Sequence, residues 1–139
     1  MKFKLPMLAA FAGLSLAGCA TLDGTGQAQH ALLVRNEASG AEAAPLAAAI
    51  KRSALATHAF RSVGDAGPGT IVVSLDSIRP ATLRDGSAGF TYLVTWQRDG
   101  VQIGRQEDDC AADEIRACGH DIAETMYAQV YYFDRRVRS

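Results

Sequence analysis

The feature that most constrains the fold of this chain is an Asp-Gly pair between two alternating stretches. Apolar residues occupy every second position from Phe90 to Trp96, and the alternation resumes at Val101 after Asp99-Gly100. Such alternation places the apolar side chains on one face of a strand. Asp-Gly favours the tight type I′ turn, because both central residues of that turn need a positive φ. The sequence therefore predicts an antiparallel hairpin with one buried face.

A long amphipathic helix is predicted for the end of the chain. Its apolar residues recur at spacings of three and four and form one continuous stripe. Asp113 is expected to cap the first turn, and Glu114 suits the positive end of the helix dipole. Arginines follow at the negative end, where cations are favourable. The stripe consists of Ile115, Cys118, Ile122, Met126, Val130 and Phe133.

The stretch before the hairpin predicts three more elements. Pro45 suits the first position of a helix, because its missing N–H would lack a partner there in any case. The glycine-rich turn over 64–69 separates that helix from a stretch with a period of two. The expected elements are a strand over Ala31–Val34, a helix from Pro45 to Phe60, a strand over Thr70–Arg79 and a loop over Pro80–Gly89.

This order of elements predicts an α+β fold, a two-layer sandwich. The order is strand, helix, three strands and helix. A right-handed crossover would make the first two strands parallel, and the later strands would form a meander. Both helices would then cover one face of a mixed sheet.

The N-terminus is typical of an export signal. Two lysines precede a mostly apolar segment over Leu5–Leu16, which is shorter than the roughly 20 apolar residues of a spanning helix. Leu16-Ala17-Gly18-Cys19 closes the segment, and this run resembles the lipobox of bacterial lipoproteins. The resemblance implies that residues 1–18 are removed and that acylated Cys19 anchors the chain to a membrane. An ordinary secretory signal with a chance cysteine, or a buried N-terminal helix, is the alternative.

The lipoprotein interpretation also divides the chain. Residues 1–18 would be the cleaved signal peptide, 19–29 a lipidated tether and 30–139 a single α/β domain. The tether is rich in small and polar residues, which is typical of flexible linkers. Ala20 occupies the position where Asp would retain such a protein in the inner membrane. In a Gram-negative host, the sorting rule of that family therefore implies the outer membrane, with the domain facing the periplasm.

Cys110 and Cys118 remain as an even pair once Cys19 is acylated. Because the compartment is oxidising, the pair is expected to form a disulfide, and two buried free thiols are the alternative. Within one helix the two residues would lie about 12 Å apart, which is too far for a bond. The disulfide therefore requires Cys110 to lie before the helix.

Charge and motifs exclude several classes of function. The net charge of −1 becomes −3 without the two lysines of the signal segment, which argues against nucleic-acid binding. Cys118 and His120 would point about 200° apart on a helix, so they cannot easily share a metal ion. The acidic run Glu107-Asp108-Asp109 lacks the spacing of a calcium loop and suits a solvated hairpin end. Motifs of nucleophilic, phosphate-binding and zinc-protease sites do not occur, so we predict no catalytic residues, metal or cofactor.

Tyrosines and arginines near the end of the last helix are the candidate binding residues. Tyr127 and Tyr131 are four positions apart and flank the apolar stripe. Exposed tyrosines beside Arg135 and Arg136 are of the types enriched at binding hot spots. The alternative is that the tyrosines complete the core and keep only their hydroxyls in water. The arginines would meet lipid phosphates, an acidic partner or only solvent.

The layout resembles that of several small envelope lipoproteins. The resemblance rests on the anchor, the element order and a run with Ala-Ile, Ala-Leu and Phe60-x-x-Val63 before a strand rich in Ile and Val. It includes the auxiliary lipoproteins of ABC-type lipid transport systems and the lipoprotein partner of the lipopolysaccharide-inserting barrel. The N-terminal domain of the Tol-system propeller protein has a related layout. Likeness at the level of fold is weak support for activity, and it transfers no functional residue.

The expected function is therefore that of a non-catalytic outer-membrane lipoprotein facing the periplasm. It would be an accessory or scaffold subunit of a cell-envelope assembly or transport system, with its sheet face or last helix on a protein partner. Binding of a lipid or glycolipid between the helices and the sheet is the second hypothesis, and an envelope enzyme is the third. A filled core without a cavity above about 300 Å³ would argue against the second hypothesis.

Overall fold

The chain folds into two helices and five strands in the computed structural model, which describes residues 29–138. The signal segment, Cys19 and most of the tether lie outside the described residues. The elements are β1 (His30–Asn36), α2 (Ala43–Ala56), β2 (Phe60–Ser62), β3 (Ile71–Thr82), β4 (Ala88–Arg98), β5 (Val101–Ala111) and α3 (Ile115–Arg138).

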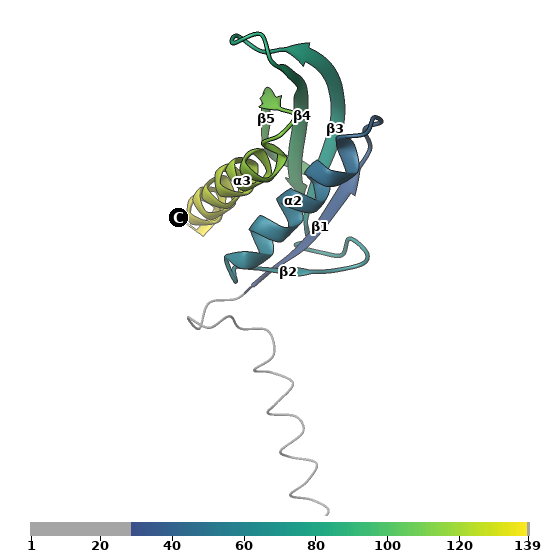
Figure 1. Cartoon of the computed structure of the whole chain (residues 1–139). Coiled ribbons are helices and arrows are strands. Elements are labelled where there is room, and N and C mark those ends of the chain that lie inside the picture. Colours follow the sequence, from purple (N-terminus) through teal and green to yellow (C-terminus); the bar gives the residue numbers. More distant parts are fainter. Residues whose placement is uncertain (1–28, 139) are drawn as a thin grey trace, which may run out of the picture.

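The strands form one mixed sheet in the order β2-β1-β3-β4-β5. β1 is parallel to β2 and to β3, whereas β3, β4 and β5 form an antiparallel meander. Both α2 and α3 lie on the same face of this sheet (Figure 1). The predicted α+β fold is confirmed, with a parallel crossover through α2 and both helices in one layer.

The Asp-Gly hairpin has the predicted geometry. Asp99 and Gly100 have φ angles of 51° and 79°, and they join β4 to β5. The Asp99 carboxylate accepts a hydrogen bond from the backbone N–H of Gly69 at 2.9 Å, which ties this turn to the loop before β3. The alternating apolar residues of β4 are all buried, namely Phe90, Tyr92, Val94 and Trp96.

The prediction of a loop over Pro80–Gly89 is wrong. β3 continues to Thr82 and β4 begins at Ala88, so only residues 83–87 connect the two strands. Pro80 lies inside β3, opposite Phe90. β1 pairs with β3 only as far as Leu75, so that the other edge of β3 is free at Pro80. A proline without an N–H is tolerated on such an edge.

The first helix is shorter than predicted, and a strand follows it. α2 begins at Ala43, so that Pro45 is its third residue, and it ends at Ala56 instead of Phe60. Phe60 starts β2, whose three residues pair in parallel with β1. Periodicity did not reveal this strand because three residues are too few to establish an alternation.

The start of α3 also differs from the prediction. The Glu114 carbonyl accepts the first helical hydrogen bond, from the N–H of Cys118 at 3.0 Å. This bond places the N-cap at Glu114 and not at Asp113. The acidic run Glu107-Asp108-Asp109 lies inside β5 rather than at a hairpin end.

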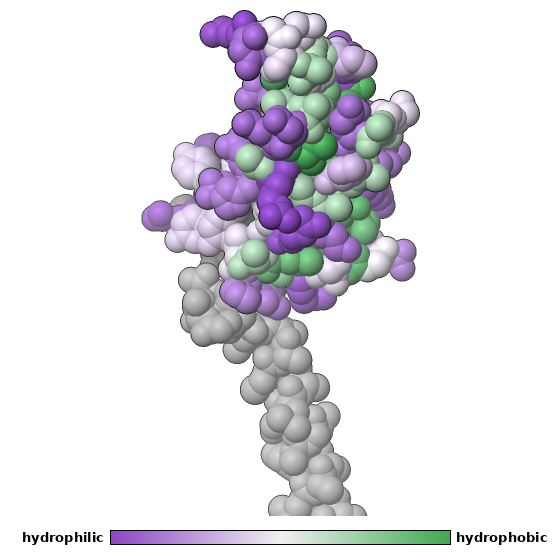
Figure 2. Space-filling view, viewed as in Figure 1, coloured by the Kyte–Doolittle hydropathy of each residue, from purple (hydrophilic) through white to green (hydrophobic). Residues whose placement is uncertain are grey.

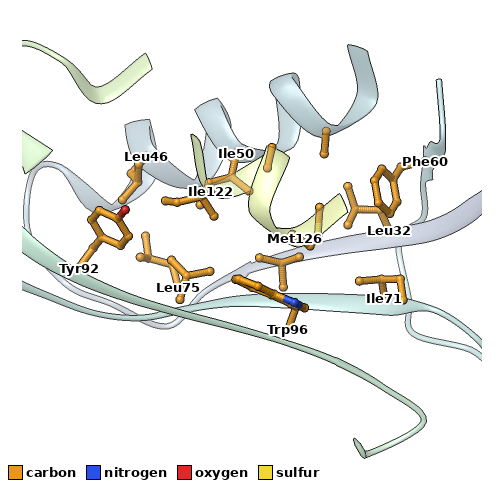
Figure 3. Close-up of a cluster of buried hydrophobic side chains, with 14 of the residues drawn as sticks. Leu32, Leu46, Ile50, Phe60, Ile71, Leu75, Tyr92, Trp96, Ile122 and Met126 are labelled. Carbon is orange, nitrogen blue, oxygen red and sulfur yellow. The ribbon is translucent and has the colours of Figure 1, made fainter. Parts of the chain in front are cut away.

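The core fills the space between the sheet and the two helices (Figure 3). Both helices and the four longer strands contribute side chains that are hidden from solvent. Burial of one such side chain contributes about 1.5–3 kcal/mol. The largest are Leu32, Leu46, Ile50, Ile71, Leu75, Phe90, Tyr92, Trp96, Ile122 and Met126.

α2 and α3 come into close contact at Gly119. A Cβ on Gly119 would lie 2.5 Å from the Cβ of Ala49 and 2.8 Å from its carbonyl carbon. The backbone of α2 therefore occupies the space that any side chain at this position would need. This close approach lets the two helices share one layer over the sheet.

The opposite face of the sheet carries polar pairs between neighbouring strands. The Thr91 hydroxyl donates to Asp109 on β5 at 2.7 Å. The Thr95 hydroxyl donates to Asp76 on β3, also at 2.7 Å. No described helix covers this face, and antiparallel sheets commonly leave one face to solvent.

β2 and β5 are the edge strands of the sheet. β2 has three residues, whereas β5 has eleven and forms a long edge. Its acidic run over 107–109 lies along this edge, and the register of β5 with β4 shifts next to Trp96. Charges and bulges of this kind disfavour the addition of another strand.

Candidate docking surface

Three tyrosines on α3 are exposed although the middle of its apolar stripe, Ile122, Met126 and Val130, is buried. The exposed fractions of Tyr127, Tyr131 and Tyr132 are 39%, 52% and 63%. The Tyr127 ring meets the edge of the core, where it contacts Phe60 with ring centroids 6.1 Å apart. The other two rings project from the helix, so they do not complete the core.

Two arginines lie over these rings. The guanidinium carbon of Arg135 is 6.0 Å from the centroid of Tyr131, and that of Arg136 is 5.8 Å from the centroid of Tyr132. Each pair is spaced four residues apart, so its members share one side of the helix. A cation over an aromatic ring is attracted by about 0.5–1 kcal/mol at exposed sites. We call Tyr127, Tyr131, Tyr132, Arg135 and Arg136 the tyrosine–arginine surface.

The sequence-predicted binding residues are thus brought together on one end of one helix. Tyr132 was not among the predicted binding residues, although its four-residue spacing to Arg136 repeats that of Tyr131 to Arg135. The repeated Tyr-x-x-x-Arg spacing is the signal that identifies it.

An ion-pair cluster fixes this end of α3 to the start of the domain. Arg98 donates to the Asp134 carboxylate at 2.7 Å, and Nε2 of His30 lies 3.2 Å from the same carboxylate. The Arg98 guanidinium also lies 4.9 Å from the centroid of the Phe133 ring. Because His30 is the first residue of β1, the chain enters the domain beside the end of α3 (Figure 1). Sequence reasoning missed the cluster because its members come from three distant segments.

A groove of about 590 Å³ separates β5 from the C-terminal half of α3 and includes Tyr132 and Phe133. Gly104 lines it, and a Cβ there would overlap Oε1 of Gln129 and lie 2.7 Å from Nε1 of Trp96. Among the described residues, neither of these two buried atoms finds a hydrogen-bond partner. One is a donor and the other an acceptor, so a water, hydroxyl or amide placed there would satisfy both.

A second groove, of about 810 Å³, lies between α2 and α3. Arg52, Arg116 and His120 surround small apolar residues in it. Nε2 of His120 lies 3.2 Å from the carboxylate of Glu124, one helical turn later. The groove therefore has a basic rim, and its α3 residues lie in the first turns of the helix, before the tyrosine–arginine surface.

The predicted disulfide joins Cys110 and Cys118, whose Cα atoms are 6.2 Å apart. Cys110 lies near the end of β5, before the helix, as the distance argument requires. The chain-entropy model gives such a short loop on the order of 2–3 kcal/mol. The bond holds the first turn of α3 to the sheet, and it removes Cys118 from any metal site with His120.

The opposite end of the molecule is acidic. The β3–β4 loop, the end of β5 and the start of α3 meet there around a groove of about 420 Å³. Asp85 in the loop accepts hydrogen bonds from the hydroxyl and the backbone N–H of Ser87, which lower the pKa of its carboxyl. Arg84 also lines the groove, and the guanidinium of Arg79 lies 3.8 Å from the carboxylate of Glu107, so carboxylates outnumber cations here without being alone. The acidic residues of these segments are Asp85, Glu107, Asp108, Asp109, Asp113 and Glu114.

A polar network that runs from the buried Tyr92 to the exposed Asp121 connects the sheet to α3. Nε2 of Gln106 donates to the Tyr92 hydroxyl at 2.7 Å and to the Asp121 carboxylate at 3.0 Å. Burial raises the pKa of Tyr92, and the charges of Asp108 and Asp121 add to this effect while the Gln106 bond opposes it. The Tyr92 phenol is therefore held neutral, as a structural acceptor rather than an activated base.

Residues 29–138 contain neither a cluster of metal-binding side chains nor a membrane-spanning helix. In this range no three His, Cys, Asp or Glu residues lie close enough together to hold a metal ion. No helix in the described part of the chain is long and apolar enough to cross a bilayer. No protein-family model matches the chain, and no curated protein matches it significantly in sequence.

Proposed function

We propose that this protein is a non-catalytic lipoprotein, anchored through Cys19 in the outer membrane and facing the periplasm. It serves as an accessory or scaffold subunit of a cell-envelope assembly or transport system. The observation that carries the proposal is the tyrosine–arginine surface, which lies where the chain enters the domain from the anchor side. Exposed tyrosines and arginines on a rigid element are typical of docking surfaces.

Rigidity of α3 supports this role. The apolar stripe, the Cys110–Cys118 disulfide and the Arg98–Asp134 ion pair hold the helix at its middle, start and end. A surface that is already ordered loses little entropy when it binds. The open face of the sheet is the second surface available to a partner, although its cross-strand polar pairs resemble an ordinary solvated face.

The anchor is tested by Cys19→Ser. Labelled palmitate should enter the wild-type protein and not the variant, because the thiol carries the acyl group. Cys110→Ser with Cys118→Ser is the matched control, since it removes two other cysteines and should leave labelling unchanged. Palmitate on the Cys19→Ser protein would refute the anchor.

The accessory role is tested by photo-crosslinking in intact cells. Probes at Tyr131 and at Thr95 report the tyrosine–arginine surface and the open sheet face, and a probe at Arg84 serves as control. One protein captured from either surface, and captured again when the probe is moved onto that protein, supports the role. Absence of a specific protein from both positions at native expression would contradict it.

The groove between β5 and α3 favours a second candidate, a lipid- or glycolipid-binding lipoprotein. The space that the sequence hypothesis assigned to the ligand holds buried core side chains instead. The groove has aromatic walls, and the unsatisfied atoms of Trp96 and Gln129 are buried beside Gly104, which lines it. Native mass spectrometry should then find a bound amphiphile that Gln129→Met releases. Purified protein without any bound lipid would contradict this candidate.

A further inference from the structure

We propose that the tyrosine–arginine surface rests on the anionic lipid surface into which the acyl chains of Cys19 insert. The inference depends on the proposed anchor and names the partner of that surface.

The first argument is the position of the chain's entry into the domain. Nε2 of His30 lies 3.2 Å from the carboxylate of Asp134, the residue before Arg135. Residues 20–29 extend over at most about 36 Å, whatever their conformation. An anchor at Cys19 therefore keeps this end of α3 near the bilayer.

The second argument is the chemistry of the surface. Tyr131 and Tyr132 are more than half exposed, with a guanidinium group over each ring. Tyrosine combines an apolar ring with a polar tip and is enriched at the boundary between membrane and water. Arginine can stack on an aromatic ring while it forms two parallel hydrogen bonds to a phosphate. Figure 2 shows hydrophilic residues on this side of the molecule, consistent with contact to headgroups rather than insertion into the hydrocarbon.

The third argument is the unequal charge of the two ends. The last eight residues of α3 contain three arginines, Arg135, Arg136 and Arg138, and one carboxylate, Asp134, so this end of the helix has a net positive charge. The acidic residues around the β3–β4 loop gather at the opposite end. An anionic bilayer attracts basic residues near it and repels carboxylates. The domain is thereby oriented with the end of α3 on the membrane and the acidic end toward the periplasm.

The test uses the full acylated protein, reconstituted in phosphatidylglycerol vesicles with brominated chains that quench nearby tryptophan. Trp96 is fully buried and gives a constant background. Tyr132→Trp places a reporter on the tyrosine–arginine surface, and Arg84→Trp places a matched reporter at the acidic end. We expect quenching of the first reporter and not of the second. The quenching should fall with added salt and in vesicles of phosphatidylcholine alone.

Arginine variants identify the contact. In the Tyr132→Trp background, Arg135→Gln with Arg136→Gln should shift the equilibrium away from the contacting orientation about 30-fold, as expected for two basic residues at an anionic surface. Arg52→Gln with Arg116→Gln removes the same charge from the groove between α2 and α3 and should leave quenching unchanged. If both double variants lost quenching equally, net charge alone would attract the protein to the vesicles, and the inference would be overturned.

Flotation of the vesicles separates the two proposals. Protein that floats but shows equal quenching of both reporters overturns the orientation and leaves the anchor standing. Protein that does not float overturns the anchor, and the orientation with it. A photo-probe at Tyr131 that captures a protein and no lipid in native membranes would assign the surface to a protein partner instead.

Discussion

The two helices lie side by side over one sheet, yet they depend on different interactions. α2 buries Leu46 and Ile50, but its N-cap makes no side-chain hydrogen bond and its last turn lacks a base. α3 buries an equally apolar stripe and also has the disulfide, the Asp134 ion pairs and the Gln106 bridge to Asp121. α2 therefore depends on packing, whereas α3 is held at several points.

This difference shows that the outer side of α3 is not needed to stabilise the fold. The outer side of α3 carries exposed aromatic rings that contribute little to the core. Attachment of α3 at its start, middle and end makes such a surface rigid without any contribution from the tyrosines. The following predictions test this separation between packing and surface.

The largest effect is expected from Ile122→Ala on the buried stripe of α3. Loss of a fully buried aliphatic side chain should lower the free energy of unfolding by about 2–5 kcal/mol, measured by urea denaturation. Tyr131→Ala on the outer side of the same helix should change it by no more than about 0.5 kcal/mol. Comparable losses in the two variants would show that the tyrosines belong to the core.

The next largest effect is expected from removal of the disulfide, which only α3 possesses among the described helices. Cys110→Ser with Cys118→Ser should lower the free energy of unfolding by about 2–3 kcal/mol, because the unfolded chain loses a closed loop. Cys19→Ser should leave the stability of the domain unchanged. Alkylation of both thiols in protein that was never reduced would contradict the bond itself.

A smaller effect is expected where the helices meet. In Gly119→Ala the new methyl group lies too close to the backbone of Ala49, so α2 and α3 must move apart. Overpacking destabilises the fold, and the better helix propensity of alanine offsets part of that cost. The free energy of unfolding should therefore fall by about 1–2 kcal/mol. Gly67→Ala is the control, because nothing lies within 4 Å of its Cβ position. Unchanged stability of the Gly119 variant would mean that the helix contact is loose.

The smallest effect concerns alkaline pH and the bridge from Tyr92 to α3. Burial raises the pKa of Tyr92, so the unfolded chain ionises first, near the ordinary tyrosine pKa of about 10. The contribution of Tyr92 to stability is thus complete below that pH and declines as the pH rises beyond it. Absorbance titration should show a late tyrosinate component that Tyr92→Phe abolishes. A titration identical in the two proteins would contradict a buried Tyr92.

Local patterns determined most of what could be predicted from the sequence. The Asp99-Gly100 hairpin and the stripe of α3 from Ile115 to Val130 depend on neighbouring residues, and both are confirmed. Phe133, the predicted end of the stripe, lines the groove beside β5 instead. β2 and the continuation of β3 through Pro80 depend on pairing with distant strands, and both were missed. Local propensity could not show that the β1 pairing ends at Leu75, which leaves Pro80 on a free edge.

The candidate site was predictable in composition and not in geometry. Helical spacing places Tyr127 and Tyr131 beside the apolar stripe, but their exposure depends on where α2 and β2 lie. The meeting of His30, Arg98 and Asp134 requires the complete sheet order. The position of the tyrosine–arginine surface beside the chain's entry into the domain therefore follows from the fold and not from the local sequence.

The long edge of β5 has a consequence for a protein held on a surface at high density. If the proposed anchor holds the chain on a membrane, its copies diffuse in two dimensions and meet repeatedly in similar orientations. A bare eleven-residue edge would act under such crowding as a template on which sheets join from copy to copy. The consecutive carboxylates of Glu107, Asp108 and Asp109 place like charges along that edge. Electrostatic repulsion between neighbours would then keep a crowded layer of these domains fluid.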